Sequence, residues 1–103
     1  MNFSLALPEE ICTELGHRVR ARRLMLNISA QELGQRAGLS TVTLSNLERT
    51  GKCTLETFIR VLEVLGATND LESVLIMQSH SIEDMKAKEA TQSRKRNSGN
   101  ERT

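Results

Sequence analysis

The side chains whose chemistry is easiest to interpret lie between residues 41 and 46, where hydroxyl, amide and methyl groups replace the Lys and Glu usual on exposed helices. Leu44 and Leu47 mark the apolar face of a predicted helix, so the remaining side chains point outward. Hydroxyls and amides can hydrogen-bond base edges in a DNA major groove, methyl groups can contact thymine, and Asn46 matches the donor and acceptor of adenine. The outward set comprises Thr41, Val42, Thr43, Ser45 and Asn46.

Basic residues surround this segment in the sequence. Residues 16–53 contain seven Arg or Lys against two Glu, although the net charge of the whole chain is only +1. A polyanion responds to the local field, so this block favours a surface that faces phosphates. The alternative is a solvated helix surface that serves solubility. The candidate phosphate contacts in the block are Arg18, Arg20, Arg22, Arg36, Arg49 and Lys52.

Two short helices joined by a tight turn are predicted to position these groups. Ser29 and Glu32 have the spacing of a capping box, Gly38 supplies the positive φ of the turn, and Ser40 caps the second helix. The expected spans are 29–37 and 40–49, with Leu33, Leu39, Leu44 and Leu47 pointing inward. This spacing is typical of a helix-turn-helix. A plain helical hairpin would explain the leucines but not the uncharged exposed face.

Helices are also predicted on both sides of this pair, which gives an all-α fold. Pro8 favours the start of a helix over residues 8–26, Thr54 caps a helix that ends at Gly66, and Asn69 with Glu72 begins a fifth helix. We therefore expect a compact five-helix bundle. The expected domains are residues 8–77 for the bundle and 78–103 for a C-terminal extension, with a short amphipathic helix over 81–90 and a disordered polar tail over 91–103.

Residues 15–76 resemble the Xre/Cro-type helix-turn-helix domain of phage repressors and many bacterial regulators. The resemblance lies in the stretches L-G-H-R-V-R-A-R-R, R-A-G-L-S and S-N-L-E, followed by the helix T-L-E-T-F-I-R-V-L-E-V-L-G. It implies a lambda-repressor-like five-helix bundle that binds duplex DNA as a symmetric dimer, with residues 40–49 in the major groove.

The resemblance also implies roles for single residues. It implies an ion pair between Arg23 of the first helix and Glu48 of the third. Such a pair would fix the relative orientation of the two helices more than it would add to the stability of the fold. The alternative is that both residues are surface charges. The family often has Gln directly after the N-cap of the second helix, and this chain has Ala30 there. The base-facing positions correspond to Thr41, Val42, Ser45 and Asn46, and positions near backbone phosphates correspond to Thr43, Arg49 and Lys52.

A narrower resemblance concerns the end of the domain. The helix F-I-R-V-L-E-V-L-G, the ending D-L-E-S-V-L and the basic tail are similar to HipB-type antitoxins. That similarity implies a repressor of its own operon with a HipA-like kinase toxin as partner. Free-standing and phage-type repressors share these features, so a regulator without a toxin partner is the alternative.

An apolar run in the fifth helix and at its exit predicts a homodimer. Val74 to Met77 are consecutive apolar residues that no single face of a small bundle can bury, so a two-fold partner is expected to cover them. The alternative is that a tail helix folds back over the run with Ile82 and Met85. The proposed interface comprises Leu71, Val74, Leu75, Ile76 and Met77.

Several functional classes are disfavoured by composition. His17 and His80 are the only histidines and no G-x-S-x-G or phosphate-cradling loop occurs, so we expect no enzyme. Cys12 and Cys53 lack metal-ligand spacing, which predicts two unpaired thiols, no metal and no cofactor. No signal peptide or membrane span is visible, which predicts a cytoplasmic protein. A helical module that binds proteins rather than DNA remains a competing interpretation.

Overall fold

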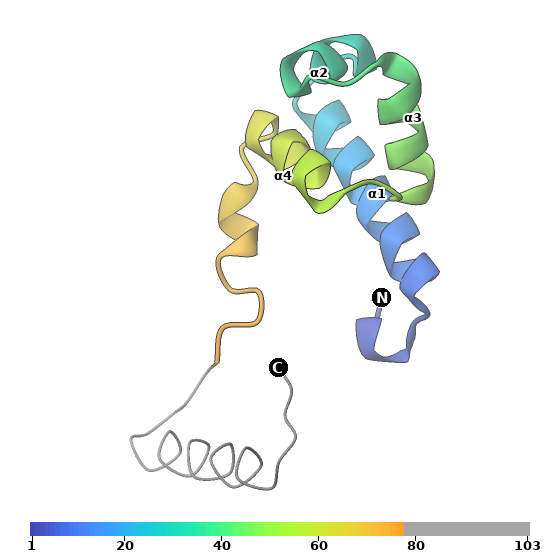
Figure 1. Ribbon diagram of the computed structural model, residues 1–103, viewed down its shortest axis with the longest axis vertical. Coiled ribbons are helices and arrows are strands. Elements are labelled where there is room, and N and C mark those ends of the chain that lie inside the picture. Colours follow the sequence, from blue (N-terminus) through green and yellow to red (C-terminus); the bar gives the residue numbers. More distant parts are fainter. Residues whose placement is uncertain (78–103) are drawn as a thin grey trace, which may run out of the picture. The chain divides into compact units, whose positions relative to one another are not determined.

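The computed structural model describes residues 1–77, and the chain divides into two units, Met1–Glu72 and Ser73–Thr103. Regular structure within residues 1–77 is helical throughout (Figure 1), which confirms the all-α prediction for that part of the chain. In chain order the elements are the 3-10 helix η1 (Phe3–Leu5), α1 (Pro8–Met25), α2 (Ala30–Ala37), α3 (Thr41–Thr50), α4 (Leu55–Val64) and the 3-10 helix η2 (Thr68–Leu71).

Hydroxyl side chains begin α2, α3 and α4. Ser29 Oγ, Ser40 Oγ and Thr54 Oγ1 each accept a hydrogen bond from the backbone N–H three residues on, at 3.0, 3.0 and 3.1 Å. These bonds satisfy N–H groups that have no partner inside the helix. The predicted helix starts are therefore confirmed. The carboxylate of Glu32, expected to complete the capping box, instead pairs with Arg36 at 3.6 Å.

Left-handed glycines end α2 and α3. Gly38 has a φ of 76° and Gly51 a φ of 72°, a region that side chains with a Cβ rarely adopt. Gly51 also lies so close to α1 that an added Cβ would overlap the carbonyl of Cys12. The end of α3 therefore packs closely on α1 at a position that only glycine can occupy.

The core forms where α3 packs on α1 and α2, and where α2 packs on α4. Gly16 of α1 is the close-approach point, because an added Cβ there would overlap the carbonyl of Leu47 in α3. Each fully buried leucine stabilises the fold by roughly 1.5 to 3 kcal/mol relative to exposure, so the leucine face decides which side of α3 turns inward. The fully buried large side chains are Leu33, Leu44, Leu47 and Val61, and Leu39 is partly buried.

The predicted fifth helix is wrong within the described residues. The chain forms η2 instead, where the N–H of Glu72 donates to the carbonyl of Asn69 at 3.1 Å, and a turn follows. Val74 and Ile76 are β-branched and exposed, so neither intrinsic preference nor packing favours a helix there. Leu75 has a φ of 62°, which interrupts a right-handed helix. Four α-helices rather than five build this part of the chain.

Two further expectations fall on residues that the structure does not describe. The extension over 78–103, with its amphipathic helix over 81–90 and its polar tail, lies outside the described residues.

In the described part of the chain, no helix is both long enough and apolar enough to cross a bilayer.

Candidate nucleic-acid interface

One side of α3 is open to solvent and carries no negative charge. Figure 1 shows α3 at the edge of the unit Met1–Glu72, and its contact with α1 lies on the other side. Val42 is 71% exposed although it is apolar. The carboxylate of α3, Glu48, is buried rather than exposed. The exposed residues of α3 are Thr41, Val42, Thr43, Ser45, Asn46 and Arg49.

The helical period divides this exposed set into a centre and two edges. Successive residues lie about 100° apart around a helix, and Leu44, Leu47 and Glu48 define the buried stripe. Directly opposite is a stripe at positions i, i+3, i+4 and i+7, which we call the outer stripe of α3. It consists of Val42, Ser45, Asn46 and Arg49, whereas Thr41 and Thr43 lie at the edges.

Two pairs of side chains on or beside the exposed face are hydrogen-bonded to each other. Arg49 Nη2 donates to Asn46 Oδ1 at 2.9 Å. The hydroxyl of Ser40 donates to Thr43 Oγ1 at 2.9 Å, beside the backbone bond from Thr43 N to Ser40 Oγ. Thr43 is thereby held at the N-terminus of α3, where exposed N–H groups favour an anion.

The predicted basic residues of α1 do not form one surface. Arg20 and Arg22 are two positions apart, about 200° around the helix, so they flank the stripe that packs on α3 from opposite sides. Arg18 Nε bonds to Glu14 Oε2 at 2.9 Å, and its guanidinium lies 5.1 Å from the centre of the Phe3 ring. The Arg18 hydrogen bond lowers the pKa of Glu14, so the charge of Arg18 is offset at neutral pH.

Other cations lie closer to the two-helix unit. Arg36 is exposed on α2 and is opposed by Glu32 across 3.6 Å. Lys52 is exposed just after α3, and burial raises the pKa of the thiol of the following residue, Cys53. Arg60 of α4 was not predicted as a phosphate contact, because it lies in an acidic block of the sequence. Its guanidinium lies beside the turn that ends α2, since a Cβ added to Gly38 would be 3.5 Å from Arg60 Nη1.

A buried ion pair fixes α3 on α1. Arg23 Nε donates to Glu48 Oε2 at 2.7 Å and Nη2 donates to Oε1 at 3.1 Å. The third nitrogen, Nη1, donates to the carbonyl of Ile28 at 3.0 Å, just before α2. Arg23 is 8% and Glu48 6% exposed, and the bond to Glu48 raises the pKa of Arg23. One guanidinium therefore links α1, the chain entering α2 and the C-terminal half of α3.

The residues proposed for a dimer interface are mostly exposed. Leu75 is 98% exposed, and its neighbours in the run are also exposed. Leu71 differs, because it packs partly against the core of its own chain. Leu24, Met25 and Leu26 at the end of α1 form a second exposed apolar run that sequence reasoning did not single out.

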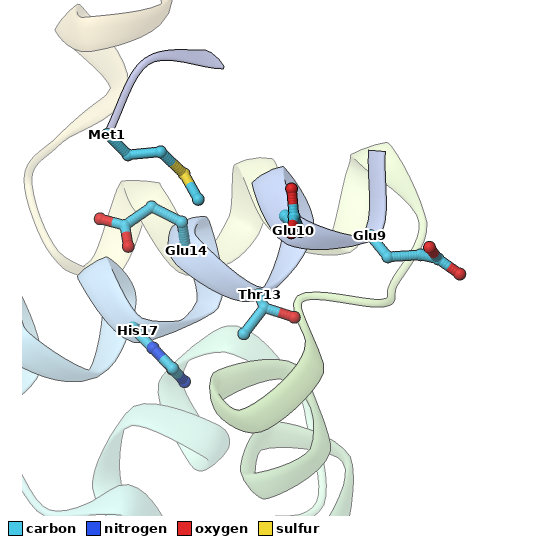
Figure 2. Close-up of a pocket in the computed structure, with 6 residues that line it drawn as sticks. All are labelled: Met1, Glu9, Glu10, Thr13, Glu14 and His17. Carbon is cyan, nitrogen blue, oxygen red and sulfur yellow. The ribbon is translucent and has the colours of Figure 1, made fainter. Parts of the chain in front are cut away.

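A hollow on α1 has the opposite electrostatic character. Figure 2 shows side chains of α1 and Met1 around it, and three of them are carboxylates. This lining repels phosphate, so the hollow does not belong with the basic residues. It is lined by Met1, Glu9, Glu10, Thr13, Glu14 and His17.

Among residues 1–77, no three His, Cys, Asp or Glu side chains are grouped as metal ligands would be.

Comparison with known families finds one matching description. A family model described as a helix-turn-helix domain matches residues 14–75. The matched range contains most of α1 and all of α2, α3, α4 and η2. No curated protein matches the chain.

Proposed function

Because this chain belongs to the helix-turn-helix domain family, we propose that it is a transcriptional regulator that binds a specific sequence of duplex DNA. The outer stripe of α3 carries this proposal. It offers hydroxyl, amide, guanidinium and methyl groups to a groove, and the carboxylate of the same helix is buried against Arg23. A helix that exposed Glu48 would instead repel the phosphates that line the groove.

Base contacts are assigned to four exposed residues of α3, and phosphate contacts to residues of α1, α2, α3 and the turn after α3. Thr41, Val42, Ser45 and Asn46 are the proposed base contacts. Each good contact discriminates by roughly 1 to 3 kcal/mol. The proposed phosphate contacts are Arg20, Arg22, Arg36, Thr43, Arg49 and Lys52, with Arg18 weakened by Glu14.

Because each base contact discriminates only weakly, we propose that the chain binds a palindromic operator as a symmetric homodimer. One subunit reads only a few base pairs, so two subunits on half-sites about one helical turn apart supply the remaining specificity. The exposed apolar run Val74 to Met77 is the proposed two-fold interface. Burial of that run in a partner removes apolar surface from water.

The regulatory role is proposed at a finer level as repression of its own operon, with the chain as the antitoxin of a HipA-like kinase toxin. The support is the similarity of residues 58–66 and 70–75 to HipB-type antitoxins. A free-standing or phage-type repressor is the alternative. A kinase-like neighbouring reading frame whose product co-purifies with this chain supports the antitoxin role, and its absence favours the free-standing repressor.

A salt titration on duplex DNA tests the proposed function. Fluorescence anisotropy with a labelled random duplex should show log K falling against log salt with a slope between about −3.5 and −5.5, for about four to six neutralised phosphates. Selection from a random duplex library should then give one palindromic sequence that binds more tightly. Absence of duplex binding at low salt contradicts the proposal and favours a protein-interaction module.

A further inference from the structure

We infer that Arg49 reads a base together with Asn46 instead of contacting a phosphate, and that the two side chains select guanine. The inference rests on the DNA-binding function proposed above. It moves Arg49 from the phosphate contacts to the base contacts, and it assigns guanine to Asn46 in place of the adenine predicted from the sequence.

The position of Arg49 on α3 is the first observation. Arg49 follows Val42 by seven residues and Ser45 by four, so it lies on the outer stripe, opposite Leu44, Leu47 and Glu48. Phosphate backbones line the two sides of a groove, whereas the outermost stripe of an inserted helix faces its floor. Arg49 therefore continues the line of Val42 and Asn46 toward the base edges.

The hydrogen bond between the two side chains is the second observation. Arg49 Nη2 lies 2.9 Å from Asn46 Oδ1, and both residues are exposed. A guanidinium can only donate, so the Asn46 atom that faces it must be the carbonyl oxygen. The amide NH2 of Asn46 is then directed away from Arg49. The bond fixes which end of the amide remains available to a base.

The hydrogen-bonding groups that remain determine the preferred base. The free Asn46 NH2 and the unused N–H groups of Arg49 are all donors. Guanine presents two acceptors in the major groove, N7 and O6, whereas adenine presents one acceptor and one donor. An adenine N6–H directed at Asn46 Oδ1 would place a second donor beside the positive guanidinium, which electrostatics disfavours. The pair consequently matches a G·C base pair.

A double-mutant cycle on the selected duplex tests this inference. The wild-type chain, Asn46→Ala, Arg49→Ala and the double variant are measured on the selected duplex, on its single base-pair variants and on random duplex. We expect the selected duplex to carry a G·C pair at one symmetric position. The binding preference for that pair should fall by about tenfold or more in either single variant, and it should fall no further in the double variant. On random duplex each variant should change binding less than twofold.

Two control variants separate base reading from charge. Arg49→Lys keeps the charge but lacks the planar fork, so it should not restore the full preference for G·C. Lys52→Ala removes a neighbouring exposed cation and should weaken selected and random duplex equally, with the salt slope reduced by about 1. Circular dichroism checks that each variant keeps its helices.

Three outcomes would overturn the inference. One is additive losses in Asn46→Ala and Arg49→Ala, and another is restoration of full preference by Arg49→Lys. The third is an A·T pair at the position that depends on Asn46. In each of these cases a wild-type chain that still selects one duplex leaves the proposed function intact. A wild-type chain that binds no duplex contradicts the proposed function and this inference with it.

Discussion

Arg23 of α1 and Glu48 of α3 are joined by two hydrogen bonds, of 2.7 and 3.1 Å, inside the core. The pair lies on the inner side of the helix whose outer stripe is proposed to read DNA. Its geometry fixes the rotation of α3 about its own axis, since Glu48 is adjacent in sequence to Arg49 and Leu47. The direction in which the outer stripe faces therefore depends on a contact made on the opposite side of α3.

Removing one partner of this pair should destabilise the fold strongly. Glu48→Ala leaves the guanidinium of Arg23 buried without its carboxylate, and we expect a loss of about 3 to 5 kcal/mol in the free energy of unfolding. Urea denaturation measures it. Replacing both residues with apolar side chains, as in Arg23→Met with Glu48→Leu, should cost much less. A loss below about 1 kcal/mol in Glu48→Ala would contradict the structural role assigned to the pair.

Two left-handed glycines form a matched test of how α3 ends. Gly51→Ala adds a Cβ that overlaps the Cys12 carbonyl, whereas Gly66→Ala adds one where nothing lies within 4 Å. Both have a φ near 70°, so both alanines carry the same backbone strain of about 1 to 2 kcal/mol. We expect Gly66→Ala to cost that amount and Gly51→Ala at least about 3 kcal/mol, by thermal or urea unfolding. Equal costs would show that the packing of Gly51 on α1 is loose.

Asn46→Ala should lower affinity for the selected duplex while binding to random duplex stays nearly unchanged. The expected loss is about 1 to 3 kcal/mol, because a base contact acts only on the matched sequence. Anisotropy titrations on both duplexes measure the difference. Asn69→Ala, an exposed Asn in η2, serves as the control and should change neither affinity. Equal losses on both duplexes would remove Asn46 from the base contacts.

Leu75→Glu should convert a dimer to a monomer. A charge in a two-fold interface meets its own copy, and burial of that charge is costly. Since Leu75 is 98% exposed within its own chain, the helices should be retained. Sedimentation measures the mass, and operator affinity should fall with it. Leu5→Glu, at another exposed leucine in η1, should leave the mass unchanged. Unchanged sedimentation of Leu75→Glu would exclude Leu75 from the interface.

The pKa of Glu14 should lie below its ordinary value of 4.5, because Arg18 donates to its carboxylate. A depressed carboxyl pKa stabilises the fold above the ordinary value, and that contribution is lost as the pH falls through the folded pKa. Carboxyl carbon NMR measures the titration. Arg18→Gln should raise the midpoint toward 4.5. A midpoint that does not move would show that Arg18 is free to meet a phosphate.

The sequence predicts local features of this fold well and features that depend on distant contacts less well. The caps at Ser40 and Thr54 and the left-handed turn at Gly38 need only neighbouring residues, and each prediction is confirmed. The fifth helix fails because a capping pattern at Asn69 does not supply core partners for Val74.

The same distinction applies to the candidate interface. The exposed face of α3 follows from the period of its leucines, since exposure is set by the helix itself. The constraint on the Asn46 amide depends on a specific side-chain hydrogen bond to Arg49, and the closeness of Arg60 to Gly38 depends on how α4 packs on α2. Neither relationship can be derived from residue types alone.

Amide NMR of the 15N-labelled chain, titrated with the selected duplex, tests most directly whether the outer stripe of α3 enters the DNA groove. We expect the largest shifts at Val42, Ser45, Asn46 and Arg49, including the side-chain amide of Asn46, while the acidic lining of the hollow on α1 stays unperturbed. Binding accompanied by shifts at Leu24 to Leu26, with α3 unchanged, would contradict it.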